Sequence, residues 1–280
     1  MTETASPEPG PPDVVWFSDD ACLDIAVAGG KGASLAAMTA AELPVPPGFV
    51  IPSNALERAV DAERLRELSR AQAHQEAQEL VRSAEPPRQS IVRGYERLGG
   101  AVAVRSSAAA EDSEAASYAG QQETYLHVSG ADEVCRRVVD CWASFFSERA
   151  LFYRARKGSL EDLEMAVVVQ KMLDPEKSGV LFTADPVHRR RDRMVVESVF
   201  GLGEQVVSGE VTPDHYVLDR AGAVRRQRVV HDQVLEEEEL RELAELGCRL
   251  EERFGMPQDI EWAMVDGKIF LLQSRPVTTL

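Results

Sequence analysis

The chain has 280 residues, of which 44 % are hydrophobic and 28 % charged, and its formal net charge is −16 at pH 7. That length is enough for one large domain, or two lobes, around a substantial core. The acidic balance excludes a general nucleic-acid or anionic-membrane surface, because either partner is repelled at long range, and a bound anion would need locally placed cations.

The N-terminal segment is acidic and proline-rich, with neither a basic start nor an apolar stretch, so residues 1–13 are predicted to form a disordered arm and not a signal peptide. No window approaches the roughly 18 consecutive apolar residues of a membrane span. The four cysteines show neither a CxxC pair nor the spacing of zinc ligands. These features predict a reduced cytoplasmic protein with buried thiols.

The first half of the chain is predicted to be mainly helical. A glycine turn and an alanine-rich helix occupy residues 27–42, and the prolines that follow end the helix. Residues 54–98 have helical periodicity broken by two prolines, which predicts two or three surface helices. A short strand at 101–104 then leads into a run of small and polar residues that is typical of a loop.

Strand-like segments dominate the second half. One long amphipathic helix is expected over residues 131–157, and an acidic helix over 236–254 precedes a closing hairpin. Between them lie three short apolar runs bounded by turn residues: 166–172, 179–183 and 194–199. This order predicts an α+β module with antiparallel or mixed sheets.

The first candidate phosphate-binding motif is GGKG, residues 29–32, at a helix start. Its glycines permit close backbone approach, a helix N-terminus favours negative charge, and Lys31 adds a point charge. The spacing does not fit a Walker A loop. A plain turn before a helix is the competing interpretation.

The second candidate is Arg105, at a strand end before the loop that closes at Gly120 and Thr124. An arginine there can fork two hydrogen bonds onto phosphate oxygens, while the small-residue loop folds over the nucleotide and donates backbone N–H groups. A flexible surface loop with solvated acids explains the composition equally well.

The third candidate is the closing hairpin, whose turn signal at residues 265–268 allows two registers. A two-residue loop pairs Val265 with Lys268, and Glu261 then faces Leu272. That register sets a carboxylate beside an apolar residue.

A three-residue loop, in contrast, pairs Val265 with Ile269. One face of the hairpin then carries four polar residues, Asp259, Glu261, Gln273 and Arg275, while the other is apolar, with Ile260, Trp262, Met264, Phe270 and Leu272. We favour this register because it gathers the polar side chains.

Carboxylate and amide oxygens on one face suit Mg²⁺, which takes one or two protein ligands and completes its shell with water and phosphate. An adjacent arginine would hold phosphoryl oxygens as charge shifts in the transition state. A surface hairpin closed by an Asp259–Arg275 salt bridge is the alternative. Gln170, a polar residue inside an apolar strand, is a candidate for hydrogen bonding to an adenine edge, or an ordinary edge-strand glutamine.

Together these segments resemble the ATP-binding domain of pyruvate phosphate dikinase, phosphoenolpyruvate synthase and rifampin phosphotransferase. The resemblance runs in order from about residue 25 to the end, through strings such as GGKGASLAAM, VAVRSSAAAEDSEAASYAGQQETYL, SGVLFTADP and DIEWAMVDGKIFLLQSRPVTT. It implies an ATP-grasp-like fold in residues 14–280, with approximate lobes 14–180 and 181–280 around a nucleotide cleft.

The resemblance also implies roles for individual residues, with ATP and Mg²⁺ as cofactors. Lys31 and Arg105 would hold ATP phosphates, Gly120 and Thr124 would belong to the phosphate-covering loop, and Gln170 would lie near the base. Glu261 and Gln273 would coordinate Mg²⁺, next to Asp259, and Arg275 would contact the transferred phosphoryl group. Arg275, Arg105 and Lys31 are therefore the expected catalytic residues.

Two departures from the family bear on function. Ala109 stands where the family usually has threonine. The resemblance also implies a swivelling histidine domain and a substrate domain after the matched part, and we expect this module to work without either in the same chain. One hypothesis is a split system, in which the chain passes a phosphoryl group to a histidine on a separate, phosphohistidine-bearing and substrate-binding protein. The alternatives are a stand-alone kinase for a small metabolite or antibiotic, and a non-catalytic ATP-binding protein.

Overall fold

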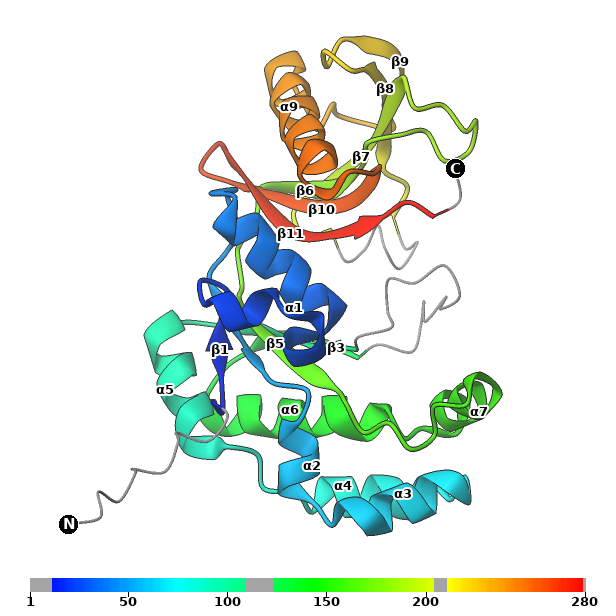
Figure 1. Ribbon diagram of the computed structural model, residues 1–280. Helices are drawn as coiled ribbons and strands as arrows, with labels where there is room; N and C mark the ends of the chain where they lie inside the picture. The colour runs from blue at the N-terminus through cyan, green and yellow to red at the C-terminus, as the bar shows by residue number, and fades with distance from the viewer. Residues whose placement is uncertain (1–11, 109–122, 204–210, 279–280) are drawn as a thin grey trace, which may run out of the picture.

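A computed structural model of the chain describes residues 12–108, 123–203 and 211–278. They form two lobes, each built on one sheet (Figure 1). The first lobe contains β1 (Val15–Trp16), the 3-10 turn η1 (Asp20–Leu23), α1 (Ile25–Ala40), β2 (Gly48–Ile51), α2 (Ala55–Ala59), α3 (Ala62–Arg70), α4 (His74–Arg82), α5 (Arg88–Leu98), β3 (Val102–Ser107), β4 (Thr124–Val128), α6 (Ala131–Ser144), α7 (Glu148–Lys157) and β5 (Ala166–Lys171). The second contains β6 (Lys177–Phe182), β7 (Arg193–Phe200), β8 (Asp214–Asp219), β9 (Val224–Arg228), α9 (Glu237–Phe254), β10 (Gln258–Val265) and β11 (Lys268–Pro276).

Every strand pairing among the described residues is antiparallel. The first sheet has the order β1-β2-β5-β3-β4, and the second β11-β10-β6-β7-β8-β9. The predicted α+β class with two sheets around a cleft is confirmed. β6 already belongs to the second sheet, so that sheet starts at Lys177, before the approximate lobe boundary at residue 180.

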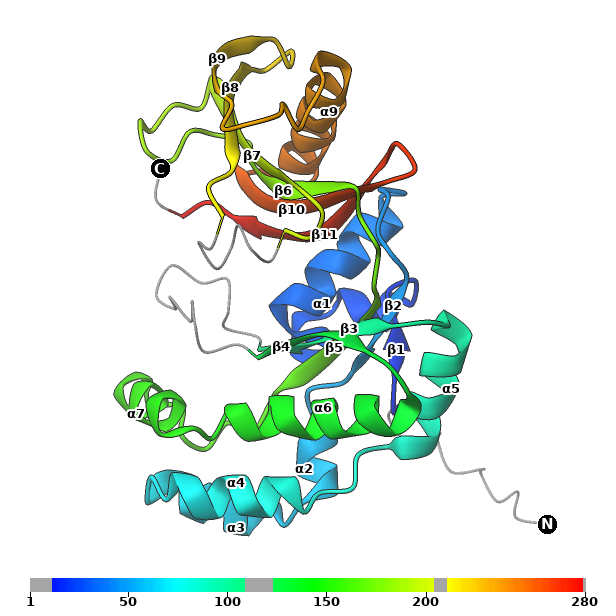
Figure 2. The same ribbon diagram turned by 180° about the vertical axis from the view of Figure 1, so that it is seen from behind.

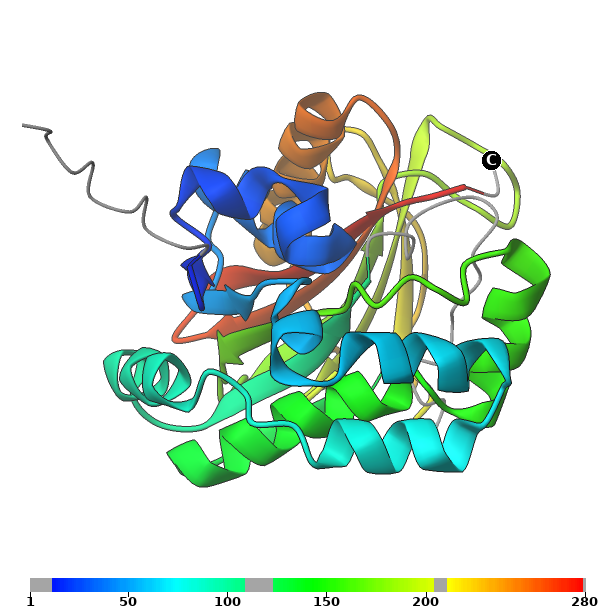
Figure 3. The same ribbon diagram turned by 60° about the horizontal axis from the view of Figure 1, so that its bottom comes forward.

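The two sheets are stacked with helices in five layers (Figures 1 and 2). The first sheet has helices on both faces because both faces of its strands are apolar. In β5, Val167 and Val169 face the helices α2 to α6, whereas Ala166 and Val168 face α1. The helices α3, α4 and α6 cover the outer face of the first sheet (Figure 3). On the far side of the second sheet lies α9, whose apolar stripe includes Leu243 and Leu250.

The central layer is α1, which is packed against both sheets. Its buried residues Leu35 and Met38 belong to the same apolar cluster as Leu181 and Trp262 of the second lobe. The predicted glycine turn is present as a kink inside this helix, at Gly29, where φ is +67°.

Close contact explains the glycine at the kink. A Cβ atom on Gly29 would lie 2.1 Å from the carbonyl oxygen of Ser107, at the end of β3. The Ser107 hydroxyl donates to the carbonyl of Ala28 and accepts from the N–H of Gly32. The kink therefore fastens the GGKG segment to the strand that carries Arg105.

Two sequence-based helix predictions need correction. The helix expected over 131–157 is interrupted, because Ser147 adopts an extended conformation and its hydroxyl caps the N-terminus of α7. Residues 54–98 form four helices, α2 to α5, where two or three were predicted. The additional helix arises because Asp61 caps the N-terminus of α3 two residues after the short helix α2 ends.

Within the described residues, none of the helices combines the length and apolar character needed to cross a membrane. Three of the four cysteines are buried, namely Cys22, Cys135 and Cys141, and Cys248 is partly buried. Burial raises the pKa of the Cys22 thiol to about 12.

Candidate nucleotide site

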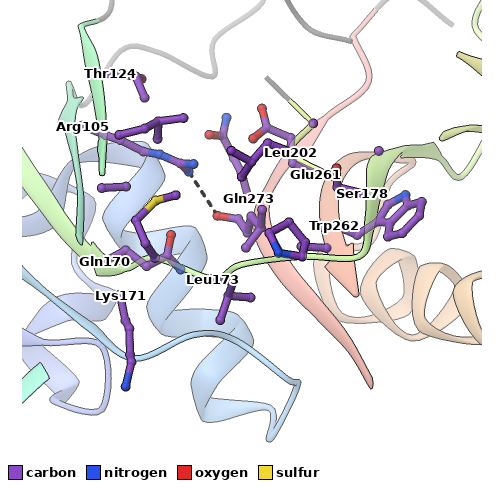
Figure 4. A pocket seen from close by; sticks show the side chains of 18 residues that line it. Arg105, Thr124, Gln170, Lys171, Leu173, Ser178, Leu202, Glu261, Trp262 and Gln273 are labelled. Atoms are coloured by element: carbon purple, nitrogen blue, oxygen red, sulfur yellow. Dashed lines mark hydrogen bonds between the residues drawn. The ribbon is translucent and has the colours of Figure 1, made fainter. Parts of the chain in front are cut away.

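A cleft of about 350 Å³ lies between the two sheets, a size typical of small-ligand sites. The first lobe contributes Arg105 and Gln170, and the second Glu261 and Gln273, so the cleft requires both lobes (Figure 4). Apolar side chains form the rest of the wall, including Ala103, Leu126, Met172, Leu173, Leu202 and Leu272. The cleft thus has an apolar part and a polar part where the two lobes meet.

The closing hairpin, formed by β10 and β11, supplies the polar part. It turns in two residues, Asp266 and Gly267, both at positive φ, and Val265 pairs with Lys268. The predicted three-residue loop is wrong. The Asp-Gly pair suits the tight two-residue turn, because both positions tolerate positive φ.

The predicted pairing at the far end of the hairpin is nevertheless present. A β-bulge lies where Trp262 pairs with Leu271 and Glu261 pairs with Gln273, so that Leu272 is the extra residue. The bulge shifts the register by one residue, and Asp259 pairs with Arg275 as predicted. Glu261 and Gln273 point in the same direction from neighbouring strands (Figure 4).

The bulge also changes which residues fill the apolar face. Ile260, Trp262 and Met264 are buried in the core, as predicted. On β11, however, the core residues are Ile269 and Leu271 in place of the predicted Phe270 and Leu272. Leu272 instead lines the cleft.

An ion pair stands next to the Glu261–Gln273 pair. Arg275 Nε lies 2.8 Å from Asp259 Oδ2, and the side chains are 53 % and 12 % exposed, respectively. Burial raises the pKa of the Asp259 carboxyl above its ordinary value; the Arg275 guanidinium opposes this rise, and the charge of Glu261 adds to it. Arg275 is therefore the group that favours the ionised form of Asp259, against burial and the charge of Glu261.

Arg105 reaches across the cleft from the first lobe. It is 9 % exposed, and its Nη1 atom lies 3.5 Å from the carbonyl oxygen of Leu272, at the bulge (Figure 4). Its buried Nε atom has no hydrogen-bond partner in the described part of the chain. A buried guanidinium N–H without an acceptor is costly, and the guanidinium as a whole lines the cleft, where it favours an anion.

Gln170 and Thr124 complete the lining on the first-lobe side. Gln170 is 2 % exposed, and its amide donates to the carbonyl of Pro46 at 3.3 Å. Thr124 pairs with Arg105 across β3 and β4 and is exposed at the cleft.

The other predicted residues lie apart from this lining. Lys31 is 5 % exposed, and its Nζ donates to the carbonyl of Ser106 at 2.9 Å, behind the strand that carries Arg105. Gly120 lies outside the described residues, as does Ala109. Asp259 and Arg275 lie two ladder positions beyond the Glu261–Gln273 pair that lines the cleft, with the Ile260–Ser274 pair between them.

The donor set fits a hard divalent cation. No group of three or more His, Cys, Asp or Glu side chains occurs among residues 12–108, 123–203 and 211–278 at metal-binding distance. Glu261 and Gln273 offer one carboxylate and one amide oxygen, which suits Mg²⁺ with water and phosphate as its remaining ligands.

Comparison with known proteins shows which family the chain belongs to. Residues 25–232 and 222–280 match the family described as "Pyruvate phosphate dikinase, AMP/ATP-binding domain". The chain belongs to this family. The AMP/ATP-binding domain therefore accounts for nearly all of the chain after the N-terminal arm.

The relatives of this AMP/ATP-binding domain are longer proteins. The chain is 40 % identical to a probable phosphoenolpyruvate synthase of Archaeoglobus fulgidus over 95 % of its own length and 42 % of that protein. It is 43 % identical to a rifampicin phosphotransferase of Streptomyces sviceus over 91 % of its length and 35 % of that protein. The chain thus spans less than half the length of these relatives.

Likeness to solved structures is slight. A D-alanyl-alanine synthetase A from Vibrio cholerae is similar with a TM-score of 0.37 and 12 % sequence identity, over 87 % of this chain and 56 % of that one. A likeness of this size has no bearing on function.

Several residues that build the cleft were not found by sequence reasoning. Leu272 was predicted on the apolar face of the hairpin and not in the cleft, because the predicted register had no bulge. Lys171, the last residue of β5, lines the cleft together with Met172 and Leu173, which begin the connection to the second sheet. Their position directly after the strand that carries Gln170 is a usable signal, since a chain that crosses between lobes borders the space between them.

Proposed function

We propose that this AMP/ATP-binding domain is an ATP-dependent phosphotransferase module that passes a phosphoryl group to a histidine on a separate protein. The observation that carries the proposal is the convergence of Arg105 with the Glu261–Gln273 pair in one cleft. Phosphoryl transfer requires positioning and charge stabilisation more than covalent chemistry, and these groups provide both.

The two parts of the cleft suit the two parts of ATP. The apolar wall, with Met172, Leu173 and Leu202, accommodates a base, and Gln170 offers an amide beside it. The polar end offers the guanidinium group of Arg105 to phosphate oxygens. Mg²⁺, held by Glu261 and Gln273, would neutralise charge on the phosphates.

We assign contact with the transferred phosphoryl group to Arg275, which lies on β11 two residues beyond Gln273. In the transfer, a bridging P–O bond of the triphosphate breaks, a P–N bond to the acceptor imidazole forms, and the leaving nucleotide keeps the electron pair. Arg275 would hold equatorial phosphoryl oxygens during this step, released in part from Asp259. Lys31 would join the phosphate contacts after leaving the Ser106 carbonyl.

Product analysis tests the proposal. The purified chain is incubated with Mg²⁺ and γ- or β-labelled ATP, alone and with a separately produced phosphohistidine-domain protein, and nucleotides are separated by chromatography. We expect acid-labile label on the partner and ADP or AMP formation that depends on it. Failure to label any partner histidine, with turnover only on a small molecule, would overturn the proposal.

Site variants sharpen this experiment. Glu261→Gln removes the negative charge of a metal ligand and Arg275→Ala removes a phosphate contact, so each should lower turnover by at least about 100-fold. Lys268→Ala, at the exposed end of the same hairpin, is the matched control and should keep full activity. Retained turnover in both site variants would reject the assignment.

A second candidate is a kinase for a small molecule. It is favoured by the 43 % identity to a protein named rifampicin phosphotransferase and by the 53 % exposure of Arg275, which leaves that side chain accessible to a small acceptor. Nucleotide turnover by the chain alone, dependent on such an acceptor, would support it. Mg²⁺-dependent turnover of either kind excludes a non-catalytic ATP-binding protein.

A further inference from the structure

Among the described residues, three hydrogen bonds join the outer edge of β11 to the first lobe. The N–H of Leu271 donates to the carbonyl of Pro44 at 2.8 Å, and Arg105 donates to the carbonyl of Leu272. The Ser34 hydroxyl donates to the carbonyl of Ser274 at 2.7 Å. Since β11 is the terminal strand of its sheet, the first lobe occupies an edge that would otherwise lack partners.

The bond from Ser34 has a special position on this edge. Ser274 lies between Gln273 and Arg275, the two β11 residues assigned to metal and phosphoryl contacts. Ser274 is also held from the opposite side, because its hydroxyl donates to Gln258 Oε1 at 2.9 Å, and both residues are at most 3 % exposed. The backbone between Gln273 and Arg275 is therefore held by one hydrogen bond to each lobe.

Ser34 also connects this strand to the GGKG segment. It lies three residues after Lys31 on α1, so both side chains leave neighbouring positions on the helix surface. Lys31 donates to Ser106 in the first sheet and Ser34 to Ser274 in the second. One short stretch of helix thus sets the separation between the two walls of the cleft.

We infer that Ser34 is a positioning residue: its hydrogen bond to the Ser274 carbonyl holds Gln273 and Arg275 at the correct distance from Arg105 and the helix that carries Lys31. The inference rests on the proposed function. Ser34 is not among the residues that line the cleft, so it acts through the strand and not on the nucleotide.

Ser34→Ala tests this inference, because it deletes only the hydroxyl oxygen. A small misplacement of catalytic groups lowers the rate far more than it lowers affinity, so we expect kcat for Mg·ATP turnover to fall about tenfold. The KM for ATP should change less than about twofold. The Mg²⁺ concentration that gives half the maximal rate should rise severalfold, because Gln273 and Glu261 lose alignment.

Two further variants separate positioning from folding. Thr39→Val is the matched control: its hydroxyl also bonds a backbone carbonyl, that of Leu35 at 2.8 Å, but within α1 itself. It should leave kcat and the Mg²⁺ dependence unchanged. Ser34→Thr keeps a hydroxyl and should restore most of the rate. Melting temperatures of all three variants, measured alongside, should stay within a few degrees of the wild type.

The outcomes distinguish the inference from the function beneath it. If the wild type and Ser34→Ala turn over ATP with the same kcat, the positioning role is rejected and the proposed function stands. If Ser34→Ala lowers only the melting temperature and the folded fraction, the bond is structural and the inference is again rejected. If the wild type shows no Mg²⁺-dependent turnover with the phosphohistidine-domain protein present, both the proposed function and the inference fail.

Discussion

At the scale of single residues, a comparison of Gly29 with Gly99 distinguishes the cost of backbone strain from the cost of a steric clash. Gly29→Ala would force an alanine to φ +67° and bring its Cβ to 2.1 Å from the Ser107 carbonyl oxygen. Gly99 also has positive φ, at +64°, but nothing lies within 4 Å of its Cβ position. We therefore expect Gly99→Ala to cost about 1–2 kcal/mol of unfolding free energy.

Gly29→Ala should cost roughly 1–3 kcal/mol more than that control, because β3 must also shift. Urea denaturation of both variants measures the difference. Equal losses would mean that the kink relaxes away from Ser107, and that the contact does not fasten the GGKG segment to β3.

Asp259 is the residue from which a pH dependence follows. Its pKa is raised in the folded state, chiefly by burial, so the folded protein keeps a proton at pH values where the unfolded chain has lost it. Raising the pH from the ordinary aspartate pKa through the raised value therefore lowers the stability of the wild type. Asp259→Asn removes this contribution.

Denaturation midpoints from pH 4 to pH 8 test the sign. The stability of Asp259→Asn relative to the wild type should increase as the pH rises. Asp266→Asn, at the exposed turn of the same hairpin, is the control for a generic loss of negative charge. A constant difference between Asp259→Asn and the wild type across this range would contradict the expectation.

At the scale of elements, the bulge in the closing hairpin decides how the two lobes meet. Without Leu272 the ladder would be regular, and Glu261 would still face Gln273. The strand would, however, be shorter by about 3.4 Å, and the hydrogen bonds donated by Leu271 to Pro44 and by Ser34 to Ser274 could not both persist.

Deletion of Leu272 should therefore weaken nucleotide binding by about tenfold, or ~1.4 kcal/mol. Leu272→Ala keeps the bulge and its carbonyl and should weaken binding only about two- to threefold. Calorimetric titration with ADP compares the two variants. Equal affinities would show that the side chain, and not the backbone spacing, is what matters.

The hairpin also illustrates how far the sequence could predict this structure. Alternating polar and apolar residues fixed the Glu261–Gln273 and Asp259–Arg275 pairs, because a misplaced register buries charge. The same pattern could not reveal the bulge, since a longer loop and a bulge give the same distal register. Only contacts with α1 and Arg105, distant in sequence, distinguish them.

Other elements show the same limit. The break between α6 and α7 depends on Ser147, a single capping residue within an otherwise helical pattern. The burial of Lys31 against Ser106 is a tertiary contact over 75 residues, which no local pattern encodes. The placement of Lys31 as a phosphate ligand remains a prediction.

At the scale of the whole molecule, the two lobes share one apolar core through α1. Side chains of the first lobe, such as Leu35 and Val168, belong to the same cluster as Trp262 and Leu250 of the second. We expect thermal unfolding in a single cooperative transition, with coincident curves from tryptophan fluorescence and far-UV circular dichroism.

Addition of Mg·ATP at about 100 times its dissociation constant should increase the free energy of unfolding by ~2.7 kcal/mol, and the single transition should move to a higher temperature. An added ligand that moves only part of a biphasic curve would instead indicate two independently folded lobes.

The exposure of Arg275 has a kinetic consequence. A phosphoryl group held by a side chain that is 53 % exposed is within reach of solvent, so water competes with any other acceptor at this position. The module would then be a leaky donor, with a slow background loss of ATP whenever no acceptor is bound. An acceptor that docks over Arg275 would suppress that loss and be phosphorylated in its place, so the fidelity of transfer would be set by how long the acceptor stays.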